Sequence, residues 1–387
     1  MTQGSTAHAE QADMVRQEPA SSGRWGMEPS SREVLLLAVL VCTVFITAVS
    51  VLHGWFALVD NFADSAAYMA IASAIRRWNF QGLVVKQFWG YPYLMAAISM
   101  LTGASNRAAL LFVSLISCFL SIAFAHRLWG GWVAGFFAVL NFDWMQRSCL
   151  GGSEPLFVAL LFAAFLAARR ERWTLAALLA ALSTVVRPLG FFALAGVGLV
   201  LLWRRQFRKL AVAVLIGLMV GALYVLPLAL FFGDPLATVH SYDQLGGPGT
   251  RIFGVPFYAI IKGTILDPAP VTNLILTFGW IGFVTAGSVV MVASARFRHY
   301  ARSHAVEIIF AAPYLLSIYS YNFPHWARGT FARFAIPIIP FVLLALDRWL
   351  PKDRRLLWAL AVVSPLLAAA SAVGIRNTMD ILRRVLT

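Results

Sequence analysis

Long apolar runs separated by short polar segments make up the chain from about residue 34 onward. A helix that crosses the hydrocarbon core of a membrane needs about 20 mostly apolar residues. The runs that approach this length are 34–52, 106–126, 131–148, 153–168, 174–187, 189–203, 209–232, 271–294, 305–320, 331–346 and 355–374. A further run, 91–101, is only about half a span. The pattern predicts an all-α, polytopic transmembrane helical bundle of about eleven spans.

Composition supports a lipid environment for most of the chain. Hydrophobic residues make up 60% of it and charged residues 12%, with a mean hydropathy of +0.75, against about 45–50% and about 25% in soluble domains. Residues 1–33 are polar and predict a disordered cytoplasmic tail. Residues 34–387 predict a single transmembrane domain, and the run from Val34 is too long for a cleaved signal, so we expect a retained first span.

Basic residues give the bundle an orientation. The net charge is +14, but the arginines form short bursts at 169–172, 204–209, 296–302 and 348–355 rather than one patch, which argues against nucleic-acid binding. All four bursts fall on the cytoplasmic side if the half-length run 91–101 is a juxtamembrane or re-entrant helix. The long outer loops are then 53–105 and 233–270. Three arginines after residue 375 fall on the outer side, so either the last run does not cross or this tail lies on the membrane surface.

Two carboxylates in the first outer loop are candidates for catalysis. Asp60 and Asp64 are spaced i, i+4, which places them on one face of any helix that begins there. Two close carboxylates raise each other's pKa, which suits a general base or a metal ligand. Alternatively, Asp60 or Asn61 serves only as a helix N-cap.

Further charged residues fall on the same outer face. Glu154 opens the fourth span in Ser153-Glu154-Pro155, where it either serves the site or only stabilises the helix N-terminus. Arg187 interrupts a long apolar stretch as a phosphate ligand, or else extends to the interface as a structural residue. Arg333 opens the tenth span.

The remaining outer candidates are His325, Arg328 and Lys86, with one of Arg328 and Arg333 expected to be only an interface anchor. Asp143 and Arg147 lie one helical turn apart and are expected to pair with each other.

Other chemistry has little support in the sequence. The loop 233–270 contains His240 and a glycine-rich stretch at 246–249, so it could serve as a pliable lid. No nucleotide loop, nucleophile elbow or metal-ligand spacing is found, and the three cysteines have no pairing pattern. We therefore expect no required cofactor; a divalent metal is conceivable but unsupported.

The order of these motifs resembles the GT-C class of membrane glycosyltransferases. The resemblance runs from about residue 34 to 350 and consists of these segments in order: Asp64 with Tyr68, Gly90-Tyr91-Pro92, Arg127-Leu128-Trp129-Gly130, Ser153-Glu154-Pro155, Arg187-Pro188-Leu189-Gly190, Gly233-Asp234-Pro235-Leu236 and Arg333-Phe334 with Pro337 and Pro340. The chain has Asp-x-x-x-Asp where the class often has a closer acidic pair, and it lacks the large outer carboxyl-terminal domain of some members. It is most similar to small members like the GPI mannosyltransferases.

The resemblance implies a function. Asp64 would be the catalytic base, assisted by Asp60, while Arg187 and Arg333 would hold a lipid-linked phosphate. The implied reaction moves a hexose such as mannose, with inversion, from a polyprenyl-phosphate carrier to a hydroxyl of a glycan, lipid or protein acceptor. The site would face outward from a bacterial plasma membrane and serve the cell envelope. The alternatives are a transporter or flippase of lipid or lipid-linked sugar, and a non-catalytic protein with the same fold.

Overall fold

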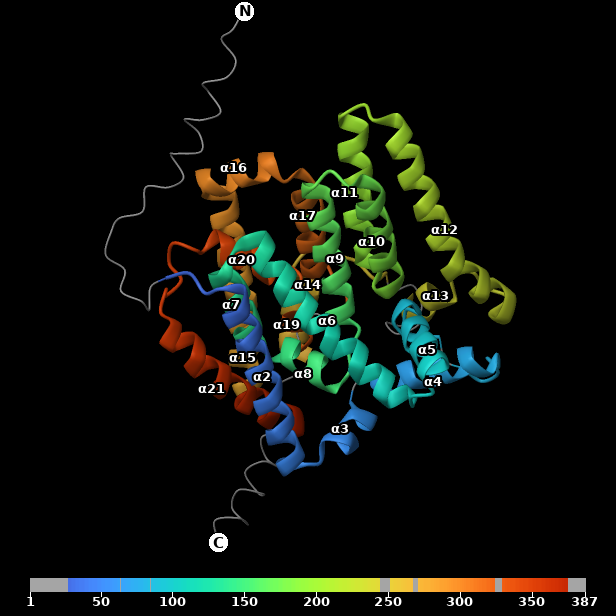
Figure 1. Ribbon diagram of the computed structural model, residues 1–387, viewed down its shortest axis with the longest axis horizontal. Helices are drawn as coiled ribbons and strands as arrows, with labels where there is room; N and C mark the ends of the chain where they lie inside the picture. Colours follow the sequence, from blue (N-terminus) through green and yellow to red (C-terminus); the bar gives the residue numbers. More distant parts are fainter. Residues whose placement is uncertain are drawn as a thin grey trace, which may run out of the picture.

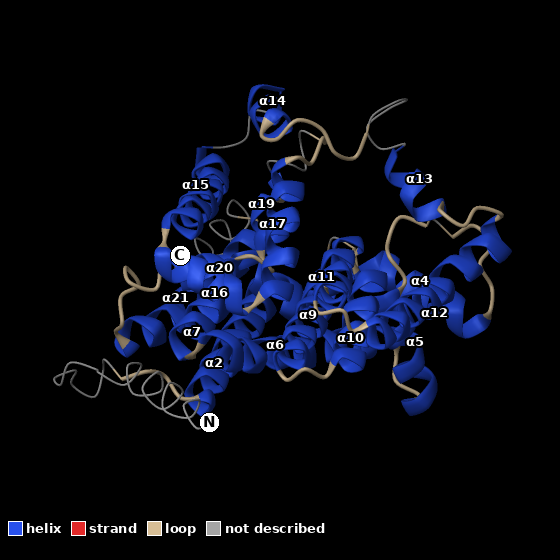
Figure 2. Ribbon diagram, turned by 90° about the horizontal axis from the view of Figure 1, so that it is seen from above, coloured by secondary structure: helices blue, strands red, loops and turns tan. Residues whose placement is uncertain are grey.

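The computed structural model describes residues 27–62, 64–83, 85–243, 251–266, 271–323 and 329–374. Across these residues the fold consists of helices and loops without a strand (Figure 2), apart from one isolated antiparallel bridge between Phe253 and Tyr321. The all-α prediction is confirmed.

The helices follow one another in a long series, labelled as in Figure 1. They are α2 (Ser31–Leu52), α3 (Trp55–Asn61), α4 (Ser65–Arg77), α5 (Gly90–Thr102), α6 (Asn106–Trp129), α7 (Gly131–Leu140), α8 (Phe142–Leu150), α9 (Glu154–Arg169), α10 (Trp173–Val186), the 3-10 turn η1 (Pro188–Gly190), α11 (Phe191–Trp203), α12 (Phe207–Phe232), α13 (Ala237–Asp243), α14 (Tyr258–Leu266), α15 (Val271–Ala293), α16 (Ala295–Ser303), α17 (Ala305–Tyr319), α19 (Phe331–Ala335), α20 (Ile339–Ala345) and α21 (Arg354–Val373).

Within the described residues, four helices are long and apolar enough to cross a membrane alone: α2, α6, α12 and α21. Two sharply bent pairs raise this number to six, namely α8 with α9, bent by 106°, and the later part of α15 with α16, bent by 78°. Several of the remaining predicted runs correspond to shorter apolar helices, namely α7, α10, α11 together with η1, and α17. The count of about eleven crossings stays a prediction.

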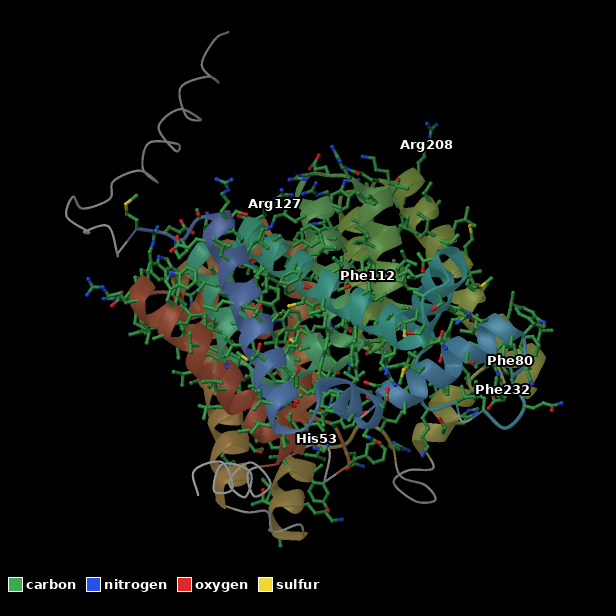
Figure 3. The ribbon with its side chains drawn as sticks, turned by 60° about the horizontal axis from the view of Figure 1, so that its bottom comes forward. His53, Phe80, Phe112, Arg127, Arg208 and Phe232 are labelled. Carbon is green, nitrogen blue, oxygen red and sulfur yellow. The ribbon has the colours of Figure 1, made fainter. Side chains whose placement is uncertain are left out.

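The ends of the bundle differ in charge. The turns 170–172 and 204–206 and helix α16 lie at the upper end of Figure 1, and Figure 3 places Arg127 and Arg208 together at one end and His53, the residue after α2, at the opposite end. Helix α2 ends and α6 begins away from the basic end, so segment 53–105 makes no net crossing of the bundle. This segment contains the short helices α3, α4 and α5, and the half-length run 91–101 corresponds to α5.

Two predicted runs are broken. The run 131–148 divides at Asn141, where α7 ends and α8 begins. The buried Asn141 side chain accepts a hydrogen bond from the Trp144 amide at 2.8 Å and donates to the Ala332 carbonyl at 3.0 Å. Because the side chain of Asn141 caps the first turn of α8, one continuous helix does not form. The run 331–346 likewise divides into α19 and α20.

Helix α2 begins at Ser31, which shortens the predicted polar tail. The Ser30 hydroxyl accepts a hydrogen bond from the Glu33 amide and caps the helix. The Glu28 carboxylate accepts one from the Gly131 amide at 2.6 Å, and Arg354 donates to the Met27 and Glu28 carbonyls. Residues 27–30 are therefore bound to the bundle.

Aromatic side chains fix the first outer segment against α12. The Phe80 ring, in the loop after α4, lies with its centroid 4.2 Å from the Phe231 ring and 6.5 Å from the Phe232 ring, and Figure 3 shows Phe80 beside Phe232. The buried Trp89 ring stacks on Phe80 at 5.6 Å. These contacts hold α4 and α5 in position at the end of the bundle away from the basic turns.

Candidate active site

Asp64 lies between two helices rather than within one. Helix α3 ends at Asn61 and α4 begins at Ser65, which makes Asp64 the N-cap residue of α4. Its carboxylate makes no capping bond and is free to reach across the bundle. The expectation that Asp60 and Asp64 share one helical face is wrong, because the chain turns between them. The Asp60 carboxylate instead binds Arg107, whose Nε lies 2.8 Å from Oδ1.

Arg333, in the short helix α19, connects two carboxylates from distant parts of the chain. Its Nη2 donates to Asp64 Oδ2 at 2.8 Å, and its Nε donates to Glu154 Oε1. The planar guanidinium carries five N–H donors in a fixed fork, so it can hold both acceptors at once. Helix α19 is only five residues long, and turns interrupt the helical path on both sides of it, so the Arg333 side chain can reach Asp64 and Glu154.

Glu154 is the most deeply buried charged residue of the cluster, with 2% of its surface exposed. It is the first residue of α9, and its Oε1 accepts a second charge-assisted bond from Arg187 Nη1 at 2.6 Å. Burial of a carboxylate is tolerated where such bonds compensate the lost hydration. Glu154 therefore contacts Arg187 and Arg333 and is more than a helix-end charge.

Ser153 and Tyr68 extend the cluster toward α4. Ser153 occupies the N-cap position of α9 but makes no capping bond with its side chain. Its hydroxyl accepts bonds from Tyr68 at 3.0 Å and from Arg187 Nη1 at 3.3 Å. The Tyr68 ring packs edge-on against Tyr91 with centroids 5.0 Å apart. Burial raises the pKa of Tyr68 well above its usual value, so its hydroxyl stays protonated and acts as a donor.

Two glycines allow the close approach of these groups. Gly151 ends α8 with φ of +92°, a conformation that L side chains rarely adopt. At Gly152 a Cβ atom would lie 2.7 Å from Glu154 Oε2 and 2.8 Å from the Arg147 side chain. The Gly151-Gly152 turn thus bends α8 sharply against α9 and leaves room for the two charged side chains beside it.

Arg147 belongs to the site, although the sequence did not suggest it. Its Nη1 lies 3.9 Å from Asp64 Oδ2, and its guanidinium carbon lies 4.6 Å from the centre of the Phe62 ring. The side chain is almost fully buried, and its Nε and Nη1 have no hydrogen-bond partner among the described residues. The sequence predicted an ion pair between Arg147 and Asp143. The structure instead pairs Arg147 with Asp64. The i, i+4 spacing favoured a local pair with Asp143, and nothing in the sequence indicated the contact with the distant Asp64.

Charge fixes the state of Asp64. Burial by itself raises the pKa of this carboxyl, but the guanidiniums of Arg333 and Arg147 outweigh burial and hold the pKa below its usual value. Gln87 adds a donor 3.4 Å from Oδ1. Asp64 is therefore an ionised acceptor at neutral pH, and part of its side chain remains open to solvent.

The other predicted residues have different positions. Lys86 is exposed next to Gln87, and it is Gln87 that contacts Asp64. His325 and Arg328 lie outside the described residues, as does the glycine stretch 246–249. In the predicted lid, His240 binds Asp234 at 2.7 Å. This bond and the Leu236 amide lower the pKa of Asp234.

Comparison with known structures identifies the architecture. ArnT from Cupriavidus metallidurans, in a crystal structure bound to undecaprenyl phosphate, superimposes with a TM-score of 0.52 at 15% sequence identity, covering 85% of this chain and 62% of ArnT. The chain has the GT-C fold. The oligosaccharyltransferase of Archaeoglobus fulgidus, in its apo form, superimposes with a TM-score of 0.44 at 16% identity over 90% of this chain and 56% of that one.

Overall sequence similarity is low, and comparisons of the sequence alone found no relative. No family model matches the chain, and no curated protein matches it significantly. The chain spans about three fifths of the length of ArnT. At 15% identity the likeness establishes the fold, so the activity has to be argued from the site.

Proposed function

We propose that this chain is a membrane glycosyltransferase that transfers a hexose from a polyprenyl-phosphate carrier to an acceptor hydroxyl, with inversion at the anomeric carbon. One observation carries the proposal. Arg333 binds the ionised carboxylate of Asp64 and also binds Glu154. Glu154 in turn binds Arg187, so a second guanidinium lies in the same cluster as Asp64. A proton acceptor thereby lies next to groups that neutralise phosphate, the pair of functions that this transfer requires. ArnT, which has the same fold, was crystallised with undecaprenyl phosphate.

The reaction is a single displacement. The acceptor oxygen attacks the anomeric carbon of the donor, and its proton passes to Asp64. The bond between the anomeric carbon and the phosphate oxygen breaks, which releases polyprenyl phosphate with the electron pair. Arg333 and Arg187 stabilise the negative charge on the departing phosphate. Among the described residues, the hydrogen bonds of Arg187 use only Nη1, so its Nε and Nη2 hydrogens remain available to the phosphate.

Sharing of Arg333 couples donor binding to the strength of the base. In the structure Arg333 lowers the pKa of Asp64 and makes it a weak proton acceptor. When a donor phosphate takes up part of the Arg333 hydrogen bonding, the stabilisation of the Asp64 carboxylate decreases and its pKa rises. Asp64 then becomes a better base only when a donor is present. Asp60, which is held by Arg107, has the lesser role.

The proposed site faces away from the basic turns. We infer from the positive-inside rule that these turns are cytoplasmic and that Asp64 faces the extracytoplasmic side, and we propose a bacterial plasma membrane as the location. The polyprenyl tail would lie between helices in the lipid, with the sugar phosphate at the cluster. Acceptors reaching this face include glycans, lipids and proteins of the cell envelope, and mannose is the first sugar to test.

The test uses purified protein in proteoliposomes with radiolabelled polyprenyl-phosphate sugars, mannose and glucose first, and a panel of hydroxyl acceptors. Wild-type protein should form a labelled product, and Asp64→Asn should lose at least about a thousandfold in rate while remaining inserted and folded. Asp60→Asn, which removes a carboxylate of the same segment, should retain most of the activity. Full transfer by Asp64→Asn would refute the assignment of the base, and loss in Asp60→Asn alone would move it to Asp60.

Transport of a lipid-linked sugar is the alternative, although the helix breaks of transporters lie near the membrane midplane and the 106° bend between α8 and α9 lies at one end of the bundle. The same proteoliposomes distinguish the two. A transporter moves labelled lipid between leaflets without forming a new glycosidic bond. A non-catalytic protein with this fold would bind donor through Arg187 and Arg333 but give neither product nor movement.

A further inference from the structure

A second cluster of charged side chains surrounds a cavity at the basic end of the bundle. The cavity has a volume of about 380 Å³ and lies where α9, α10, α11 and α17 meet, close to α16 (Figure 1). Helix α9 carries Glu154 at its first residue and the cavity residue Arg169 at its last. At 1.5 Å per residue, these two residues lie about 22 Å apart along the helix. The cavity is therefore separate from the proposed active site.

The charges around this cavity leave a positive excess. Two of its three arginines are neutralised: Arg169 binds the buried Glu307 with Nε 2.6 Å from Oε1 and Nη2 3.0 Å from Oε2, and Arg204 lies 2.7 Å from Glu171. The third, Arg302, is exposed and has no ion pair within the described part of the chain. Three guanidiniums face two carboxylates, so one positive charge is uncompensated.

Unused hydrogen-bond donors belong to residues that line this cavity. The indole N–H of Trp173, in the cavity wall, is buried and has no partner among the described residues. Helix α17 begins at Ala305 without a side-chain cap. The amide of its third residue bonds to the His304 carbonyl at 3.1 Å, which leaves the amides of Ala305 and Val306 as donors at the positive end of the helix dipole. Arg204 also lies over the Trp173 ring at 5.2 Å, which fixes both side chains. Such a set of donors matches a phosphate group.

The surroundings favour a lipid as the source of that phosphate. Trp203 ends α11 at the cavity and is 82% exposed, and tryptophan is enriched at the level of lipid headgroups. Leu199 and Leu202, on the preceding turn, are about half exposed and offer an apolar surface for acyl chains. Basic pockets between helices on the cytoplasmic side are a recurring form of lipid headgroup site.

We propose that the cavity between Trp173, Arg204 and Arg302 binds the phosphodiester headgroup of an anionic membrane phospholipid. Arg302 supplies the uncompensated charge, and the Trp173 N–H donates to a phosphate oxygen. The bound lipid bridges the α9–α10 and α11–α12 turns to the start of α17. It holds the basic end of the bundle together without taking part in the transfer reaction.

The test measures binding of phosphatidylglycerol to the full chain in phosphatidylcholine nanodiscs, by native mass spectrometry and by displacement of a fluorescent phosphatidylglycerol. Arg302→Gln should weaken binding about tenfold, the effect of losing one charge-assisted bond. Trp173→Phe, which keeps an aromatic ring but removes the N–H donor together with the larger indole, should weaken it by a smaller factor. The matched control is Arg208→Gln. Arg208 lies at the same end of the bundle (Figure 3) and carries the same charge, but it does not line the cavity.

Three results would overturn the proposal. Equal weakening by Arg302→Gln and Arg208→Gln would indicate only diffuse attraction between a basic surface and an anionic membrane. No weakening by Arg302→Gln would place any bound lipid elsewhere. Inorganic phosphate that binds as tightly as the lipid, with loss of this binding in Arg302→Gln, would assign the cavity to a soluble phosphate compound. Melting temperatures of all variants verify that each protein is folded.

Discussion

Asp64 and Arg333 are 269 positions apart in the chain, yet Arg333 Nη2 lies 2.8 Å from Asp64 Oδ2. The same guanidinium reaches Glu154, so one side chain connects the starts of α4 and α9. Because two carboxylates depend on one cation, changes at Arg333 should affect both the stability and the chemistry of the site.

Arg333→Lys should separate charge from geometry. A lysine keeps the positive charge, but its compact ammonium cannot present the fork that holds Asp64 and Glu154 together. We expect the transfer rate to fall by about a hundredfold, as when a single oxyanion donor is lost. The melting temperature should fall less for Arg333→Lys than for Arg333→Gln, which leaves buried charge unpaired. Equal rates for wild type and Arg333→Lys would show that the fork is not required.

Arg147 acts as a positioning residue for Asp64. Its guanidinium lies 3.9 Å from Asp64 Oδ2 without a close hydrogen bond. Arg147→Gln should therefore reduce kcat about tenfold, corresponding to about 1.4 kcal/mol, and leave the KM for the lipid donor nearly unchanged. Arg147→Lys should restore part of kcat. A rise in donor KM with constant kcat would instead indicate that Arg147 binds the donor phosphate.

The stability contributed by Asp64 should depend on pH in one direction. Its pKa in the folded protein is lowered by Arg333 and Arg147, so the unfolded chain binds more protons near the ordinary value of about 3.9. The contribution is then fully present above that value and is lost as the pH falls through the lower folded value. The difference in melting temperature between wild type and Asp64→Asn in detergent should stay constant from about pH 8 to 5 and shrink below about pH 4. A difference that already closes between pH 7 and 5 would mean that burial dominates.

Asn141 should matter for stability rather than for chemistry. Its side chain caps α8 and donates to the Ala332 carbonyl next to Arg333. Asn141→Ala should cost about 1–3 kcal/mol, since it removes a cap and leaves buried backbone groups unsatisfied. The matched control is Asn61→Ala, because Asn61 is exposed and bonds only within its own helix. Thermal unfolding in detergent measures both, and similar losses for the two variants would contradict the role given to Asn141.

Four of the site residues are recognisable in the sequence because charge is expensive in apolar surroundings. Glu154, Arg187 and Arg333 each interrupt or open an apolar run, Asp64 lies in the first outer loop on the same predicted face, and the structure brings all four together. Arg147 was not predicted as a site residue, because Asp143 lies one helical turn away and was expected to be its ion-pair partner. Asp60 was grouped with Asp64 by spacing alone, and the turn after α3 separates them.

The sequence by itself determined the all-helical, membrane-embedded character of this protein and the concentration of basic residues at one end of the bundle. Both follow from the length and composition of local segments, because backbone hydrogen bonds in lipid have to be satisfied within each helix. Only the tertiary structure decided where apolar runs break and which guanidinium meets which carboxylate. Those outcomes depend on partners from distant segments, such as the Ala332 carbonyl for Asn141 and Arg333 for Asp64, which local sequence patterns do not contain.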